Sequence, residues 1–129
     1  MKSELDAQLC QNYPRIFADR NLPMTETAMC WGFEHGDGWF NIINQLCGNI
    51  QHHIDWKTKT GKVVPQVVAE QVKEKFGTLR FYYRGGDDYI RGLVSMAESM
   101  SGVTCEECGA PGTTDGQGWI STRCETHRK

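Results

Sequence analysis

The stretch Gln71-Val-Lys-Glu-Lys-Phe-Gly-Thr-Leu-Arg-Phe-Tyr-Tyr-Arg84 predicts a β-hairpin that, with Val67 and Val68, occupies residues 67–84. Its two arms are rich in the β-branched and aromatic residues that strands favour, and Gly77 between them suits a tight turn. Side chains alternate between the two faces of a strand. One face of the second arm is therefore predicted to face the core, with Leu79, Phe81 and Tyr83. The other face is basic, with Arg80, Tyr82 and Arg84.

Helices are predicted on both sides of the hairpin. Before it, apolar residues recur at i, i+3, i+4 and i+7 from about Gly38 to Asp55, which is typical of an amphipathic helix. After it, Gly85 and Gly86 end the strand, and an aspartate is placed to cap a third helix that stops near residues 101–102. The predicted apolar stripes are Trp39, Ile42, Ile43, Leu46, Cys47, Ile50, Ile54 and Ile90, Leu93, Val94, Ala97, Met100.

The N-terminal part of the chain is less regular. Ser3 is predicted to cap a short first helix that Pro14 interrupts, because Leu5, Leu9 and Tyr13 recur at helical spacing. Residues 23–38 contain many helix and strand breakers and predict an irregular connection that ends with Asp37 as a helix cap.

These elements predict an α+β fold, in which two or three helices pack on the apolar face of a small antiparallel sheet. We expect residues 1–102 to form this core and residues 103–129 to form a zinc-ribbon-like tail packed on it. With 39% hydrophobic and 23% charged residues, the chain has the composition of a soluble globular protein. It shows neither a signal-peptide pattern nor a membrane span, so we expect a cytoplasmic protein with reduced cysteines.

The tail carries two pairs of metal-ligating residues with two residues inside each pair, Cys105-Glu-Glu-Cys108 and Cys124-Glu-Thr-His127. Each pair can reach one ion from a tight turn, and two such turns complete the tetrahedron that zinc accepts. Gly109 lets the backbone curl around the ion. Because all four positions are filled by the protein, we expect one structural zinc ion rather than a catalytic one.

Basic residues concentrate in the middle of the chain. Residues 57–84 contain seven basic and two acidic side chains, whereas the remainder contains seven basic and fourteen acidic ones. On the outer face of the hairpin, this charge lies beside one aromatic ring, an arrangement that suits either phosphate binding or a protein contact. The predicted partner-binding residues are Lys73, Lys75, Arg80, Tyr82 and Arg84. An ordinary solvated sheet face remains the alternative.

Three blocks of the sequence, at residues 36–43, 71–83 and 105–127, resemble a family of small, mostly uncharacterised proteins encoded by bacteriophages and prophages. The resemblance covers most of the chain from about residue 30 onward. It implies an accessory protein made inside an infected bacterium, a class in which binding to host proteins and inhibition of host defences are common. It carries over no catalytic residue.

Other groups of reactive side chains have simpler explanations. A catalytic metal site could be formed only if two separate groups came together, namely Glu34, His35, Asp37 and His52, His53, Asp55. A simpler explanation is that Asp37 caps a helix and that His52 and His53 are solvated residues at a helix end. Core thiols are the favoured reading of Cys10, Cys30 and Cys47, and core filling is the favoured reading of Met24, Met29, Met96 and Met100.

The sequence therefore favours a non-enzymatic, zinc-binding accessory protein that binds a host macromolecule, most plausibly a host defence protein, and inhibits or redirects it. A nucleic-acid-binding module that uses the basic hairpin face is the second hypothesis, and a small metal-dependent hydrolase is the third.

Overall fold

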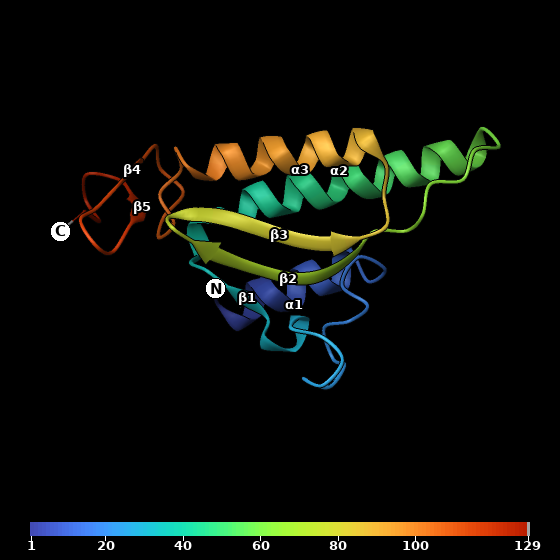
Figure 1. Cartoon of the computed structure of the whole chain (residues 1–129), viewed down its shortest axis with the longest axis horizontal. Helices are drawn as coiled ribbons and strands as arrows, with labels where there is room; N and C mark the ends of the chain where they lie inside the picture. The colour runs from blue at the N-terminus through green and yellow to red at the C-terminus, as the bar shows by residue number, and fades with distance from the viewer. Residues whose placement is uncertain (129) are drawn as a thin grey trace.

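The computed structural model describes residues 1–128 and has the α+β fold that the sequence predicts (Figure 1). Three α-helices, α1 (Ser3–Asn12), α2 (Phe40–Lys59) and α3 (Asp88–Ser101), accompany a sheet of β1 (Phe33–Glu34), β2 (Val68–Lys75) and β3 (Thr78–Arg84). Two 3-10 helices flank β1, η1 (Met29–Trp31) and η2 (Asp37–Trp39), and the tail adds a second sheet of β4 (Thr113–Asp115) and β5 (Ser121–Arg123).

The predicted hairpin is present as β2 and β3, which pair antiparallel. Phe76 and Gly77 form its two-residue turn, and both have positive φ, 54° and 86°, as a type I′ turn requires. Lys73 lies opposite Arg80, and Gln71 lies opposite Tyr82. A register shift between residues 69 and 71 places Arg84 opposite Val68.

The strand β1 lies inside the segment that the sequence predicts to be irregular. It pairs in parallel with β2, Phe33 with Val72 and Glu34 with Lys73, so the sheet is mixed rather than purely antiparallel. A strand of two residues is too short to show an alternating pattern. Its position depends instead on contacts distant in sequence, such as the N-terminal amine of Met1, which donates to the carbonyl of His35.

Helices α2 and α3 follow the predicted stripes, although α2 continues to Lys59 rather than ending near residue 55. The carboxylate of Asp87 caps α3 by accepting the backbone N–H of Ile90 at 3.1 Å, as predicted. The other two predicted caps are wrong. Ser3 lies inside α1, and the carboxylate of Asp37 accepts the backbone N–H of Lys2 at 2.7 Å instead of capping a helix.

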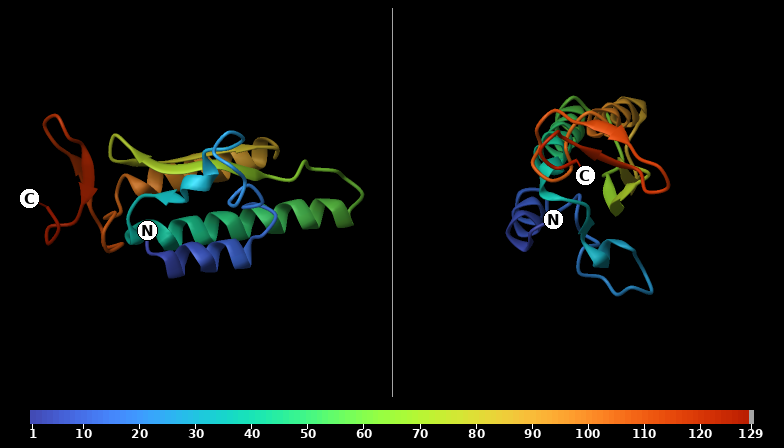
Figure 2. Two further views of the ribbon diagram at one scale, coloured as in Figure 1. Left: turned by 90° about the horizontal axis from the view of Figure 1, so that it is seen from below. Right: turned by 90° about the vertical axis from the view of Figure 1, so that its left-hand side faces the viewer.

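The hydrophobic core lies between the helices and the inner face of the sheet, and α2 runs between α1 and α3 (Figure 2). Cys47 is buried there, as predicted, and Cys10 and Cys30 are half-buried free thiols. The methionine prediction holds only for Met29. The other three, Met24, Met96 and Met100, are exposed. Met24 lies in a surface turn, and Met96 and Met100 lie on the part of the apolar stripe of α3 that the sheet does not cover.

The outer edge of the sheet is β3, and α3 supplies side chains that satisfy its backbone. Ser101 Oγ accepts the backbone N–H of Leu79 at 2.8 Å, and a carboxylate oxygen of Glu98 accepts that of Phe81 at 2.9 Å. These donors point away from β2 and would otherwise lack partners. The bonds fix α3 along the free edge of the sheet.

His35 is buried in the core between the rings of Phe33 and Trp39. Its Nδ1 lies 2.8 Å from the carbonyl oxygen of Gly36, which assigns the proton to Nδ1, and its buried Nε2 has no partner among the described residues. Burial lowers the pKa of His35 to about 4, since the charged imidazolium would lose its hydration.

This burial predicts a pH-dependent stability. Below pH ~6.5 the unfolded chain binds a proton at His35, whereas the folded chain does not bind it until about pH 4. The contribution of the neutral, buried His35 to the unfolding free energy is therefore fully present above pH ~6.5 and is lost as the pH drops toward 4. Between pH 7 and pH 4, the wild type should lose roughly 3 kcal/mol more unfolding free energy than His35→Gln. Denaturant titrations of both proteins across this range measure the difference, and parallel curves would contradict it.

A candidate metal centre in the C-terminal tail

The four predicted ligands lie together in the tail. One ligand atom from each of Cys105, Cys108, Cys124 and His127 lies within 4.8 Å of the other three. The Sγ atoms of Cys108 and Cys124 are 3.7 Å apart, and Nδ1 of His127 is 3.7 Å from Sγ of Cys105. A tetrahedral ion bound to sulfur at ~2.3 Å needs corners about 3.8 Å apart. The four side chains are therefore close enough to hold one metal ion.

Each ligand pair is held by a tight turn. In the first turn, the N–H of Gly109 donates to the carbonyl of Cys105 at 2.9 Å, and Gly109 has a φ of 82° that favours glycine. In the second, the N–H of His127 donates to the carbonyl of Cys124 at 3.2 Å. Strands β4 and β5 pair antiparallel between the two turns and bring them together.

Local hydrogen bonds favour the thiolate form that metals bind. Burial works to raise the pKa of Cys105, but backbone N–H groups, including those of Cys124 and Cys108, outweigh it and lower the pKa. The hydrogen bond with His127 lowers the pKa of Cys124 to about 6. For the same reason, the pKa of His127 is raised. The thiolate is the metal-ligating form of cysteine, so the environment of Cys105 and Cys124 suits metal binding. At Cys108 the backbone N–H of Ala110 is outweighed by burial and by the hydrogen bonds with the two other thiols, which raise its pKa.

The first metal-binding turn docks directly on the start of α2. The backbone N–H of Gly38 donates to the carbonyl of Glu106 at 2.7 Å, and that of Gly36 donates to the Glu106 carboxylate at 2.9 Å. Nε1 of Trp39 donates to the carbonyl of Thr104 at 2.9 Å. A Cβ on Gly38 would lie only 2.1 Å from the carbonyl oxygen of Cys105, so no side chain fits there. Nothing in the sequence signals this interface.

A second contact joins the tail to the hairpin turn, beside β4 and β5 in Figure 1. Oγ1 of Thr122 donates to the carbonyl of Gly77 at 2.6 Å. A Cβ on Gly77 would lie 3.1 Å from Cγ2 of Ile120, so the turn touches the segment that precedes β5. Oγ1 of Thr114 also donates to the carbonyl of Gly102 at 2.7 Å. The tail is thus attached to the core at both η2 and the hairpin turn.

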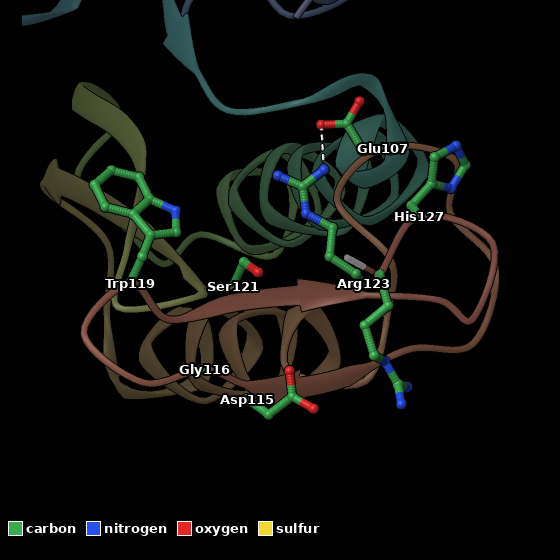
Figure 3. A pocket seen from close by; sticks show the side chains of 8 residues that line it. Glu107, Asp115, Gly116, Trp119, Ser121, Arg123 and His127 are labelled. Atoms are coloured by element: carbon green, nitrogen blue, oxygen red, sulfur yellow. Dashed lines mark ion pairs between the residues drawn. The ribbon is translucent and has the colours of Figure 1, made fainter.

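An open hollow of about 590 Å³ lies beside the metal ligands (Figure 3). Glu107 and Arg123 form an ion pair across it, and Trp119 stands at the end away from His127. This ion pair uses two of the charged side chains that line the hollow. Its remaining lining residues are Asp115, Gly116, Ser121 and Arg128.

The two groups considered for a catalytic metal site do not form one. Among residues 1–128, no other set of three or more His, Cys, Asp or Glu side chains is placed to share an ion. Four of the six residues have partners elsewhere: Glu34 with Gln71, Asp37 with Lys2, His53 with Asp87 and Asp55 with Arg15. The remaining two are the buried His35 and the exposed His52.

His53 differs from its prediction as a solvated residue. It is largely buried, its Nε2 lies 2.8 Å from the carboxylate of Asp87, and its ring stacks on Tyr89 with 4.3 Å between centroids. The hydrogen bond with His53 lowers the pKa of Asp87. These contacts connect the C-terminal half of α2 to the start of α3, a pairing that residues 34 positions apart do not reveal in sequence.

The predicted partner face is exposed but less basic than expected. Tyr82 points outward from β3, and Arg80 is half-buried beside Lys73. Arg84 forms ion pairs with Asp19 at 2.7 Å and Glu70 at 3.6 Å, and the Asp19 contact raises its pKa. Its charge is therefore neutralised within the fold, and Lys73 similarly lies in register with Glu34 on β1.

No family model, curated protein or solved structure matches the chain. Among the helices of residues 1–128, none combines the length and the apolar character that crossing a bilayer demands.

The geometry of the centre predicts one bound metal ion per chain and a tail that depends on it. Cys124→Ser should abolish stoichiometric metal binding and loosen the tail, because a structural ion supplies much of the folding free energy of such a module. Elemental analysis measures the metal, and hydrogen exchange of residues 103–128 measures the loosening. The control Cys10→Ser removes a thiol distant from the centre and should keep the ion. Zinc-free protein after purification from zinc-supplemented cells would contradict the prediction.

The docking of the tail on η2 predicts an unusual sensitivity at Gly38. Gly38→Ala places a methyl group against the backbone of the first metal-binding turn and should lower the unfolding free energy by roughly 1–3 kcal/mol. Gly92→Ala is the control, because its added Cβ meets nothing within 4 Å in the middle of α3 and should stabilise the helix by up to ~1 kcal/mol. Equal effects of the two substitutions in denaturant titrations would disprove the close approach.

Proposed function

We propose that the chain is a non-enzymatic binding protein, stabilised by one structural zinc ion, whose partner is another protein. The observation that carries this proposal is a pair of exposed aromatic side chains where the hairpin meets the tail. Phe76 is 66% exposed and Trp119 is 79% exposed. The resemblance to phage-encoded proteins supports the further proposal of an accessory protein that acts on a protein of the bacterial host.

The donor set supports zinc as the ion. Three thiolates and one imidazole in tetrahedral reach of one another are soft and borderline ligands, which favour zinc over the oxygen-seeking ions magnesium and calcium. With all four corners supplied by the protein, no position is left for a reacting water. The ion would therefore serve to hold the tail against the core.

Phe76 occupies its turn at a cost in stability. A bulky side chain at positive φ is disfavoured, and asparagine or glycine would be cheaper at this position of a type I′ turn. The folded chain offsets little of this cost, because the ring is mostly exposed and lies against the Lys75 ammonium, which is 5.6 Å from its centroid. Strained residues of this kind gather at functional sites, where a ligand makes use of them.

The tail determines where Trp119 stands. Trp119 precedes Ile120 and β5, and both Ile120 and Thr122 contact Gly77 of the hairpin turn. The metal ligand Cys124 follows directly after β5, so the ion holds this strand in place. We call the combined surface the tip surface and define it as Phe76, Trp119 and the outer hairpin residues Lys73, Lys75, Arg80 and Tyr82.

The composition of the tip surface suits a protein partner. Tyr, Trp, Phe and Arg are enriched in protein interfaces and contribute most of the binding energy there. Phosphate binding needs a continuous excess of positive charge, but Arg84 is paired with Asp19 and Lys73 lies beside Glu34. Residues 105–128 of the tail add four acidic and only two basic side chains. These charges disfavour a nucleic-acid backbone at this surface.

The strain at Phe76 predicts opposite effects of one substitution on stability and on binding. Phe76→Asn should raise the unfolding free energy by roughly 0.5–1 kcal/mol, since asparagine tolerates positive φ. It should weaken partner binding by about thirtyfold, as expected for a hot-spot side chain worth ~2 kcal/mol. Denaturant titration measures the first effect. Photo-crosslinking from position 76 in host-cell lysate identifies the partner, and titration of that partner measures the second.

Val63 provides the matched control, because it is 91% exposed on the loop between α2 and β2, at the opposite end of the molecule from the hairpin turn (Figure 1). Val63→Asn should leave binding unchanged, and a crosslinker at position 63 should not capture the partner. Equal binding by Phe76→Asn and the wild type would refute the tip surface. Tight, salt-sensitive retention on DNA that is lost in Arg80→Ala would instead favour the nucleic-acid hypothesis.

A further inference from the structure

Between Asn41 and Trp56 of α2 and along α3, the outer face of the two helices carries no charged side chain, and Lys59 follows on this face only at the end of α2. On α2, the residues at i, i+4, i+8, i+11 and i+15 share one face, and on α3 the residues at i, i+4, i+7 and i+11 do. The two sets are Asn41, Gln45, Asn49, His52, Trp56 and Tyr89, Leu93, Met96, Met100. Because 23% of the chain is charged, nine neighbouring positions without Asp, Glu, Lys or Arg mark a distinct surface.

We propose that this neutral face, as we call these nine residues, pairs with the same face of a second copy of the chain to form a twofold-symmetric dimer. Met96 is 64% exposed, and the Trp56 and Tyr89 rings are also exposed. Exposed methionine and aromatic side chains without surrounding charge have the composition of an interface core. No other described segment lies over this outer face of the two helices, whereas α1 and the sheet pack against their other sides (Figure 2).

A groove between the two helices supplies the complementary shape. Its hollow of about 280 Å³ has buried Ile42, Leu46 and Ala97 in its floor, and Met96 and Met100 stand at its rim. The volume lies just below the range of small-molecule sites, so it fits side chains of a helix better than a ligand. A ridge of methionines beside a groove on the same face is what self-pairing requires, since the ridge of each copy enters the groove of the other.

The absence of charge favours a second copy over a different partner. A twofold axis brings equivalent residues of the two copies near each other, so a charged residue near the axis would face its own sign. The neutral face avoids this repulsion, and its Asn and Gln side chains can both donate and accept hydrogen bonds across the axis. A charged partner would find no complementary charge on these nine residues.

The size and rigidity of the face also suit a dimer. Residues 41–56 of α2 span about 24 Å, and two adjacent helices are about 20 Å wide, so each copy offers roughly 500 Å² in projection. The pair of faces thus reaches the ~1,000 Å² that a specific interface needs. The hydrogen bond between His53 and Asp87 joins the two helices at one end of the face, so the surface is formed before association.

Sedimentation velocity of the full-length, zinc-loaded chain at micromolar concentrations tests the proposal, with a dimer as the expected species. Met96→Lys should weaken association more than tenfold while the circular dichroism spectrum stays native. The twofold axis would bring the introduced positive charges of the two copies near each other, and they would repel. Gln45→Lys repeats the test from α2 at an exposed position that the fold does not need.

Ser95→Lys is the matched control, since residue 95 is exposed on α3 but points away from the neutral face. It should remain dimeric, and so should Phe76→Asn, whose site lies on the tip surface. A wild type that stays monomeric up to about 100 μM, a concentration at which even weak specific dimers assemble, would overturn the proposal. A dimer that both Met96→Lys and Gln45→Lys leave intact would overturn it equally.

Discussion

The hydrogen bond from the backbone of Gly38 to the carbonyl of Glu106 connects the core to the metal-binding tail, and much of the structure depends on the close approach it requires. The bond forms only because residue 38 has no side chain. It sets the first metal-binding turn against the start of α2, where Trp39 is buried at one end of the core. From there the four ligands position β5, which supports the hairpin turn from the other side. The ion and the aromatic side chains at the turn are thus linked through backbone contacts.

What could be predicted from the sequence is what local spacing determines. The apolar stripes of α2 and α3, the arms of the hairpin and the two ligand pairs each repeat within a few residues, so their patterns are visible without the fold. Several contacts join residues 34 to 70 positions apart and leave no periodic trace: the pairing of β1 with β2, the bond between Gly36 and Glu106, the hydrogen bond of His53 with Asp87 and the ion pair of Arg84 with Asp19. The exposure of Met96 was mispredicted for the same reason, because the stripe on α3 does not show how much of it the sheet covers.

The two proposed surfaces differ in chemistry and in place. The tip surface combines aromatic rings with positive charge at a strained turn, whereas the neutral face is a broad helical surface without charge. The metal-binding tail supports the first, and the packing of α2 on α3 supports the second. A molecule in which both surfaces work would present two tip surfaces per dimer, and a partner with two matching sites would then bind with a higher apparent affinity through the effective concentration of the second contact.

The side chains of Ser101 and Glu98 that occupy the backbone donors of β3 have a consequence for the behaviour of the chain in a crowded solution. An edge strand with free donors is a template on which strands of other chains can add, and this route leads to aggregation and strand exchange. In this protein β3 is an edge strand, with the aromatic sequence Phe81-Tyr-Tyr83 that favours such pairing. By directing two polar side chains of α3 at Leu79 and Phe81, the fold closes that edge to intruding strands without adding another strand of its own.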